Sequence, residues 1–438
     1  MPRLLLTRLP LLGALLLAGT LPAACVAQNS HSEPETSQPA AATASATATG
    51  AETPATPADR GPGAAPALAP QPSGGFDPAL AADPGARILA AQLPAVPVQP
   101  RASRPAPRMA YVALGDSLTA GMQAAGLTAP GQYAAYPAVL ARLTDIPFGI
   151  PATQQGCPLP LGGGLRSASC VRVAGDLRGS NFAVPGARVQ DLYLKRGGES
   201  SDELTRRMYG LILGPRQTQV EAALKSRPDY LTLWIGSNDA MIGVTSGDPA
   251  EVTPPADFER QYRRVLEALR PAGARTLLLT VPDVTRLPLI SPGRVLFEKG
   301  VAGPSCQGSE NRLPLSAFLL NQPLDCGSPA ALTPAESAQI QETVAAYNAS
   351  IRRLATEFGD DVLDVQPLMD RLDIHPAQDE TSPEPFGADL SADGVHLSGA
   401  GQLKLGYALA EYVHQHWKIG LPPAATQELA AAGMSGTD

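Results

Sequence analysis

The 438-residue sequence has no excess of basic residues and no cluster of them. It contains 33 Lys and Arg against 41 Asp and Glu, which gives a formal net charge of -8 and a pI near 5.3. Proteins that bind nucleic acids present a basic surface that neutralises phosphates. The composition therefore argues against a nucleic-acid partner, and we expect none.

An apolar run long enough to span a membrane is also missing at the N-terminus, since about 20 residues are needed to cross the hydrocarbon core. Residues 1–24 instead carry Arg3 and Arg8, then a short apolar stretch, then small residues. This order is typical of an export signal and disfavours the alternative of a transmembrane anchor. We therefore expect an extracytoplasmic protein.

Two interpretations remain for the cleavage of this signal. The segment "LPAAC" ends at Cys25 and resembles the lipobox of bacterial lipoproteins, in which the cysteine is lipidated and becomes the mature N-terminus. Pro22 departs from that pattern, because an aliphatic residue is usual there. The alternative is cleavage after Ala27, which discards Cys25 and secretes the protein. We favour lipidation of Cys25, which predicts a membrane-anchored lipoprotein at the cell envelope.

Large apolar side chains are scarce between residues 25 and 108, where Ala, Pro, Thr and Ser prevail. Such a segment buries too little surface to offset its ordering entropy, so we predict a disordered, flexible tether. A short helix near 76–93 is its one expected element. We expect one folded domain at 109–418 and a flexible C-terminal tail at 419–438.

Cysteine and histidine are both scarce, with five of each. Apart from Cys25, the cysteines fall into two sequence-local pairs, Cys157 with Cys170 and Cys306 with Cys326. In an exported protein this spacing favours two disulfides. A metal site would need closer ligand pairs or neighbouring histidines, so we expect no metal.

Strand-like and helical stretches alternate through the folded region. Apolar runs predict strands at 109–115, 181–184, 230–236, 274–281 and 361–365. Apolar residues three or four positions apart predict helices at 136–143, 216–226, 258–269, 340–358 and from 398 towards 417. Alternation of this kind indicates a parallel sheet with helices on both faces.

Polar or glycine residues follow the predicted strands, at the edge where a parallel sheet binds its ligands. Ser117 in "GDSL" follows the first strand, Gly186 the second, and Asn238 in "GSND" the third. The segment "DGVHLS" precedes the last helix and contains Asp393 and His396. We therefore expect these five residues to meet at one edge of the sheet.

These residue types suit acyl transfer. A serine needs a base to become a nucleophile, and His396 can be that base while Asp393, three residues earlier, orients its ring. The backbone N–H groups of Ser117 and Gly186 and the amide of Asn238 can stabilise an oxyanion. Ser117 alone would fit a helix N-cap equally well. The combination favours the nucleophile.

The four blocks, in this order, resemble those of the SGNH hydrolases, also called the GDSL esterase/lipase family. The resemblance covers residues 109 to about 418 and includes "VPDVTRLP" at 281–288. It implies a three-layer α/β/α sandwich with a flavodoxin-like parallel sheet. It also implies hydrolysis of carboxylic esters through an acyl-enzyme, with no cofactor and no metal.

The substrate stays open, because the N-terminal extension and a cysteine-bearing insertion at about 284–334 depart from the family pattern. A lipid, a short acyl ester and an acetylated glycan all remain candidates, and acyl transfer to an envelope glycan would use the same residues. A non-catalytic binding lipoprotein is disfavoured by the complete residue set. The insertion is either a partial lid over the acyl pocket or a satellite core. We expect a monomer.

Overall fold

The computed structural model describes residues 110–158, 170–173, 179–200, 202–314, 324–376, 382 and 384–433. The predicted export signal, Cys25 and the tether with its short helix lie outside these residues. Part of the insertion and the last residues of the chain lie outside them as well. Within the described ranges, no helix combines the length and the apolar character that crossing a bilayer requires.

A four-stranded parallel sheet forms the centre of the fold. Its strands, in spatial order, are β1 (Tyr111–Gly115), β2 (Tyr230–Trp234), β3 (Arg275–Leu279) and β6 (Asp361–Leu363). The register places Gly115 beside Trp234, and Trp234 beside Leu279. The carboxyl ends of these strands therefore meet at one edge of the sheet.

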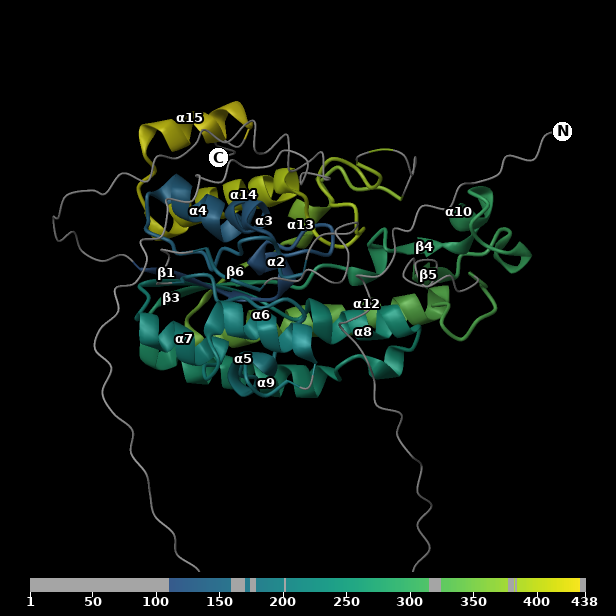
Figure 1. Cartoon of the computed structure of the whole chain (residues 1–438), viewed down its shortest axis with the longest axis horizontal. Helices are drawn as coiled ribbons and strands as arrows, with labels where there is room; N and C mark the ends of the chain where they lie inside the picture. The colour runs from purple at the N-terminus through teal and green to yellow at the C-terminus, as the bar shows by residue number, and fades with distance from the viewer. Residues whose placement is uncertain are drawn as a thin grey trace, which may run out of the picture. The chain divides into compact units, whose positions relative to one another are not determined.

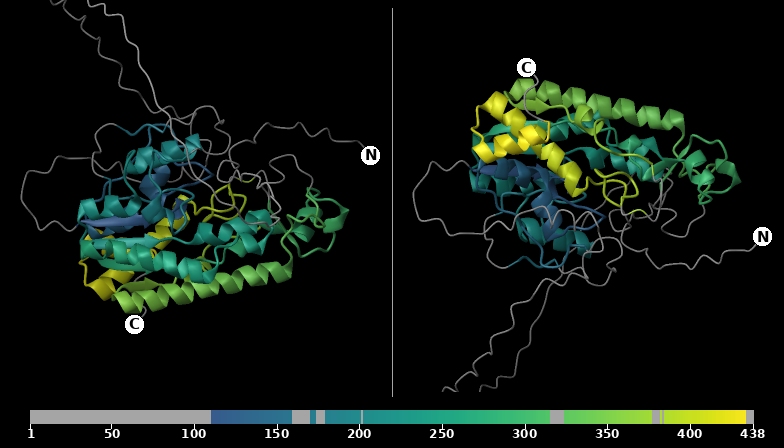
Figure 2. Two further views of the ribbon diagram at one scale, coloured as in Figure 1. Left: turned by 90° about the horizontal axis from the view of Figure 1, so that it is seen from below. Right: turned by 90° about the horizontal axis from the view of Figure 1, so that it is seen from above.

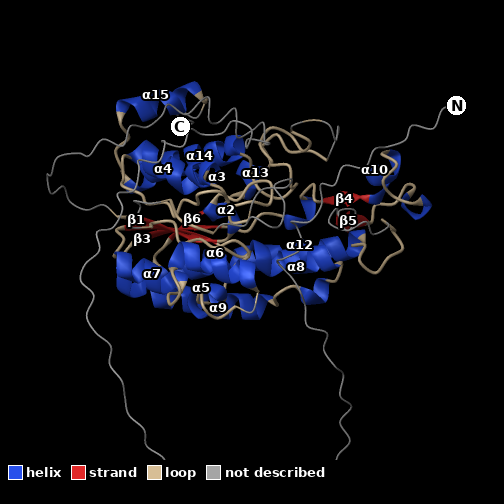
Figure 3. Ribbon diagram, in the orientation of Figure 1, coloured by secondary structure: helices blue, strands red, loops and turns tan. Residues whose placement is uncertain are grey.

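Helices cover both faces of this sheet (Figures 1 and 3). One layer contains α3 (Ala129–Ala134), α4 (Tyr136–Thr144), α13 (Gln366–Met369) and α14 (Gly399–Trp417). The other contains α5 (Asp191–Leu194), α6 (Glu203–Leu213), α7 (Gln219–Ser226), α9 (Pro255–Leu269) and α12 (Pro334–Phe358). The long green α12 runs beside the other helices of its layer in Figure 2. The predicted three-layer α/β/α fold is confirmed.

Two buried clusters form the core, one on each face of the sheet. Successive side chains of a strand point to opposite faces, and on β1 this sends Val112 and Leu114 into one cluster and Tyr111 and Ala113 into the other. The strands thus bury both faces, as their continuous apolar sequences predict.

Local sequence signals explain where the main helices begin. Thr218 and Glu221 form a capping box at the start of α7, in which each side chain bonds the other's backbone N–H. Ser398 caps α14 by accepting a hydrogen bond from the N–H of Gly401 at 3.2 Å. The latter cap fixes the loop that precedes α14, which holds Asp393 and His396.

The segment predicted as a strand at 181–184 contains only an isolated parallel bridge, between Ala113 and Asn181. Backbone hydrogen bonds still pair it with β1: Phe182 donates to the Ala113 carbonyl at 2.9 Å, and Val184 donates to the Gly115 carbonyl at 3.1 Å. The Asn181 side chain accepts from the N–H of Ala183 at 3.2 Å and donates to the Thr119 carbonyl at 2.8 Å. With this segment counted at the edge, the order still follows the flavodoxin-like 2-1-3-4-5 pattern.

The prediction of a flexible tail from residue 419 is wrong for its described part. Residues Pro423–Ala431 form helix α15, which buries Ala425 and Leu429 against the cluster around α14. Both Glu428 carboxylate oxygens accept from the Arg142 guanidinium at 2.7 Å. The helix is short and rich in alanine, so its sequence shows little apolar periodicity.

The insertion at 284–334 contains a small unit of its own, next to the N-terminal end of α12 (Figure 1). It comprises β4 (Ile290–Pro292), the antiparallel β5 (Arg312–Pro314) and α10 (Gly293–Glu298). A separate cluster of buried side chains lies within it: Leu296, Cys306, Leu313, Leu324, Cys326 and Ala331. This cluster supports the satellite-core interpretation of the insertion.

Both predicted disulfides are present, between Cys157 and Cys170 and between Cys306 and Cys326. Their Cα atoms lie 4.7 and 5.0 Å apart, within the usual range for a bridge. Disulfides persist in oxidising compartments and are rare in the cytosol. The two bridges therefore indicate an oxidising, extracytoplasmic environment.

Candidate active site

Ser117 lies where β1 gives way to the short helix α2 (Ser117–Ala120). Asp116 is the N-cap, and its carboxylate accepts a hydrogen bond from the α2 backbone at 3.0 Å. The buried Gln219 amide of α7 holds the preceding peptide: it accepts from the Gly115 N–H at 3.0 Å and donates to the Gly115 carbonyl at 2.9 Å. The Ser117 hydroxyl is therefore fixed at the carboxyl edge of the sheet.

The other predicted residues meet Ser117 at this edge. Asn238 is in the first turn of α8 (Ser237–Ser246), directly after β2, and His396 is in the loop before α14. The His396 Nε2 lies 2.8 Å from the Ser117 Oγ, and its Nδ1 lies 2.7 Å from the Asp393 Oδ2. Two segments far apart in the chain thus form a continuous serine–histidine–carboxylate chain.

The environment of Asp393 keeps it ionised. Burial by itself would raise the pKa of this carboxyl, but the neighbouring His396 and the backbone N–H groups of Val395 and His396 hold that pKa at about 2. Burial would likewise lower the pKa of the His396 imidazole, but Asp393 and, more weakly, Asp116 raise it above its ordinary value. The imidazolium is thus stabilised, as proton transfer from a serine requires.

Gly186 and Asn238 are the other two predicted oxyanion donors. Gly186 adopts a φ of +78°, a conformation that favours glycine, and it is exposed with open space where a side chain would stand. The Asn238 Nδ2 donates to the Ala187 carbonyl at 2.9 Å and lies 3.4 Å from the Asp116 Oδ2. An amide nitrogen carries two hydrogens. One binds the Ala187 carbonyl and orients the group, and the other makes the long bond to the Asp116 Oδ2, which an incoming oxyanion would replace.

Buried carboxylates beside this site have shifted pKa values. Burial raises the pKa of Asp116 to about 7, although the Leu118 N–H and His396 oppose the shift. Burial also raises the pKa of Asp239 to about 6, and its carboxylate holds the Val189 N–H at 3.0 Å. Asp116 caps α2, and Asp239 fixes the loop that follows Gly186.

We expect Gly115→Ala to destabilise the protein by about 1–3 kcal/mol, the usual cost of overpacking. A Cβ at this position would lie 2.3 Å from the Trp234 carbonyl oxygen and 2.5 Å from the Thr119 Oγ1. Thermal unfolding followed by circular dichroism measures the effect. The matched control is Gly210→Ala in α6, where a Cβ meets nothing within 4 Å and alanine favours the helix. Equal melting temperatures for the two variants would contradict the close contact.

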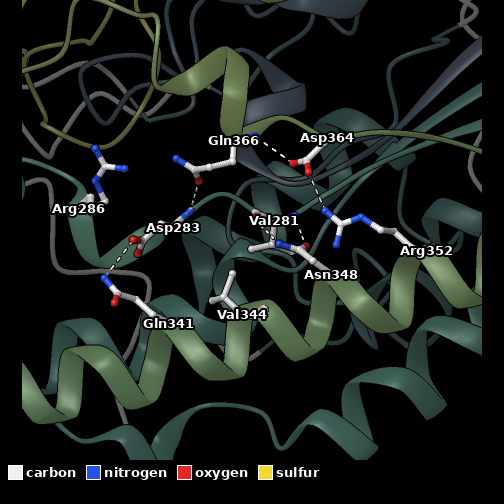
Figure 4. Close-up of a pocket in the computed structure, with 10 residues that line it drawn as sticks. Val281, Asp283, Arg286, Gln341, Val344, Asn348, Arg352, Asp364 and Gln366 are labelled. Atoms are coloured by element: carbon white, nitrogen blue, oxygen red, sulfur yellow. Dashed lines mark hydrogen bonds and ion pairs between the residues drawn. The ribbon is translucent and has the colours of Figure 1, made fainter.

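A cavity of ≈ 380 Å³ lies between α12 and the loops that follow β3 and β6 (Figure 4). Its lining includes none of the predicted catalytic residues. Arg352 donates to the Asp364 carboxylate at 2.7 Å, and Gln341 donates to Asp283 at 3.1 Å. These hydrogen bonds join α12 to the loops at the sheet edge. The polar side chains that make them are therefore already paired with one another.

Comparison with known proteins gives one family and several distant structures. The chain matches the family described as GDSL-like Lipase/Acylhydrolase over residues 111–409. It is similar to an extracellular lipase from Streptomyces rimosus, with 17% identity and a TM-score of 0.35. The aligned region covers 69% of this chain and 98% of the lipase chain. An acetyl xylan esterase from Geobacillus stearothermophilus is similar at 15% identity and a TM-score of 0.33, covering 70% and 94% of the two chains. No curated protein sequence matches the chain.

Proposed function

The chain belongs to the GDSL-like lipase/acylhydrolase family, and from this premise we propose that it is a serine-dependent carboxylic-ester hydrolase with Ser117 as nucleophile. The supporting observation is the chain of hydrogen bonds from Ser117 through His396 to Asp393, at 2.8 and 2.7 Å. All three side chains come from one polypeptide, so the proposed site needs no residue from a second subunit, and we propose that the enzyme is a monomer. Its chemistry uses protein groups and water, without a cofactor.

In the proposed first half-reaction, the Ser117 Oγ attacks the ester carbonyl carbon while its proton passes to the His396 Nε2. The Ser117 and Gly186 N–H groups and the Asn238 amide stabilise the resulting oxyanion. The intermediate collapses to an acyl-serine, and the imidazolium gives its proton to the departing alkoxide. Asp393 stabilises the imidazolium and keeps its ring oriented.

The second half-reaction releases the acid. His396 takes a proton from a water molecule, whose oxygen attacks the acyl carbon, and the same three donors hold the second oxyanion. The proton then returns to the Ser117 Oγ as the carbon–oxygen bond breaks. If a sugar hydroxyl replaced water, the product would be a transferred acyl group, and the same side chains would serve.

Turnover of p-nitrophenyl acetate by the purified residues 109–438 tests the proposal, with and without a glycan acceptor. We expect release of p-nitrophenol and acetate in equal amounts, and no acetylated glycan. Acetyl transfer that rises with acceptor concentration would identify an acyltransferase. If the folded protein hydrolyses no acyl ester, the alternative of a non-catalytic binding lipoprotein remains.

We propose that residues 1–24 are an export signal, that residues 25–108 are a tether, and that the Cys25 thiol carries lipid in the mature protein. We expect the wild type to sediment with membranes and Cys25→Ser to appear in the soluble fraction. One acyl chain binds a membrane only marginally, so stable anchoring needs several. Fractionation followed by N-terminal mass analysis measures this, with Ser30→Ala as the control. A soluble wild type that begins after Ala27 would rule out the anchor.

A further inference from the structure

A tight turn with an unusual backbone lies beside the candidate catalytic carboxylate. Gln123 and Gly126 exchange backbone hydrogen bonds at 2.9 and 2.8 Å, which closes a two-residue loop. The central residues, Ala124 and Ala125, have φ values of +47° and +57°. A turn with both central residues left-handed normally contains Asn and Gly, because a Cβ is unfavourable there. Both alanines are buried, so packing holds the turn in this conformation.

The turn directs its two central N–H groups at the loop that carries Asp393. Ala125 donates to the Asp393 Oδ2 at 2.6 Å, and Ala124 donates to the Ser391 Oγ at 3.0 Å. The Ser391 hydroxyl in turn donates to the Asp393 Oδ1 at 2.9 Å. Successive N–H groups of a turn form an anion-binding concavity. Here the Ala125 N–H binds the Asp393 carboxylate directly, and the Ala124 N–H reaches it through the Ser391 hydroxyl.

These contacts bear on both oxygens of the carboxylate. The Oδ2 that accepts from the His396 Nδ1 also accepts from Ala125, and the Oδ1 accepts from Ser391 and from two backbone N–H groups of its own loop. A carboxylate restrained in this way cannot rotate away from the imidazole. It is also a weaker acceptor towards the imidazole, since its negative charge is shared among several donors.

Resting on the proposed function, we propose that the turn at 123–126 and the Ser391 hydroxyl form a positioning device that fixes Asp393 against His396 and moderates the basicity of the imidazole. Neither part touches the reacting atoms. The backbone at Ala124 and Ala125 is strained because the left-handed conformation is needed to direct both N–H groups at Ser391 and Asp393. Strained residues are common near catalytic groups.

Ser391→Ala tests the device, because it removes a donor from Asp393 and the acceptor of the Ala124 N–H. We expect kcat/KM for p-nitrophenyl acetate to fall about 10- to 100-fold, the loss typical of one hydrogen bond to a charged group. With fewer donors, Asp393 would stabilise the imidazolium more, so the pKa of His396 would rise. The acid limb of the pH–rate profile should therefore move to higher pH. The other charges near this ring are Asp116, which His396 faces directly, and Asp239 behind it.

The His396 titration, followed by NMR on the folded protein, should show the same upward shift without any substrate. Ser391→Thr, which retains the hydroxyl, should restore both the rate and the titration. The matched control is Ser350→Ala. The buried Ser350 also accepts from one donor, Arg353, and donates to a carboxylate, Glu259, but it lies between α12 and α9. We expect that control to change the melting temperature alone.

An unchanged His396 titration in Ser391→Ala would overturn the proposal, whether or not activity falls, because a purely structural serine would lower the rate without moving the pKa. A wild type that hydrolyses no ester would instead refute the proposed function. The titration is independent of turnover, so the two failures are distinguishable.

Discussion

Replacing Ser117 by alanine is expected to lower kcat for ester hydrolysis by about 10⁴-fold or more. The substitution removes the only atom that can form the acyl-enzyme in the proposed mechanism, and His396, 2.8 Å away, is left without a proton to accept. His396→Ala should cost about as much. Residues that act as one unit lose their function together, so the double variant should be little worse than either single variant. Steady-state hydrolysis of p-nitrophenyl acetate measures all three.

Two controls separate chemistry from folding. Ser350→Ala removes a buried hydroxyl far from the β1 edge, and His375→Ala removes a ring whose Nδ1 bonds the neighbouring Pro376 carbonyl. Both should retain kcat near the wild-type value. Additive losses in the Ser117 and His396 double variant would contradict a shared catalytic unit.

Asn238→Ala is expected to lower kcat by about 10²- to 10³-fold while KM changes little, because one oxyanion donor acts mainly in the transition state. The Ala187 carbonyl holds the Asn238 amide at 2.9 Å, so the donor is oriented before substrate binds. A preorganised donor needs no rearrangement during the reaction, which is why its removal is costly.

Asn348→Ala is the matched control for this variant. Its amide also donates to a backbone carbonyl, that of Val281, at 2.9 Å, but Asn348 lies on α12 and lines the cavity shown in Figure 4. We expect it to lower stability without a selective loss of kcat. An Asn238→Ala enzyme with wild-type kcat and an intact fold would remove Asn238 from the oxyanion hole.

The sequence predicts the central sheet well because its strands are buried on both faces and their ends coincide with short polar blocks. Ser117 and Asn238 each follow such a strand directly, so the parallel register brings them to one edge. His396 meets Ser117 from 279 residues further along the chain. The proximity of these groups was predictable from topology alone, whereas their distances were not.

Other features gave weaker signals. Helix α15 buries few large side chains, and the ion pair between Arg142 and Glu428 joins it to a segment 286 residues earlier in the chain. The turn at Ala124 and Ala125 has a sequence that disfavours its own conformation, because tertiary packing overrides the local preference. Ser391 has no motif that marks it. Contacts of this kind depend on three-dimensional packing and cannot be read from periodicity.

The most direct test of the proposed mechanism is mass spectrometry of the protein quenched in acid during turnover of p-nitrophenyl acetate. We expect one acetyl group on the peptide that contains Ser117, and no such adduct in Ser117→Ala. Steady turnover with the acetyl group on another residue, or a Ser117→Ala protein that still forms the acyl-enzyme, would contradict this mechanism.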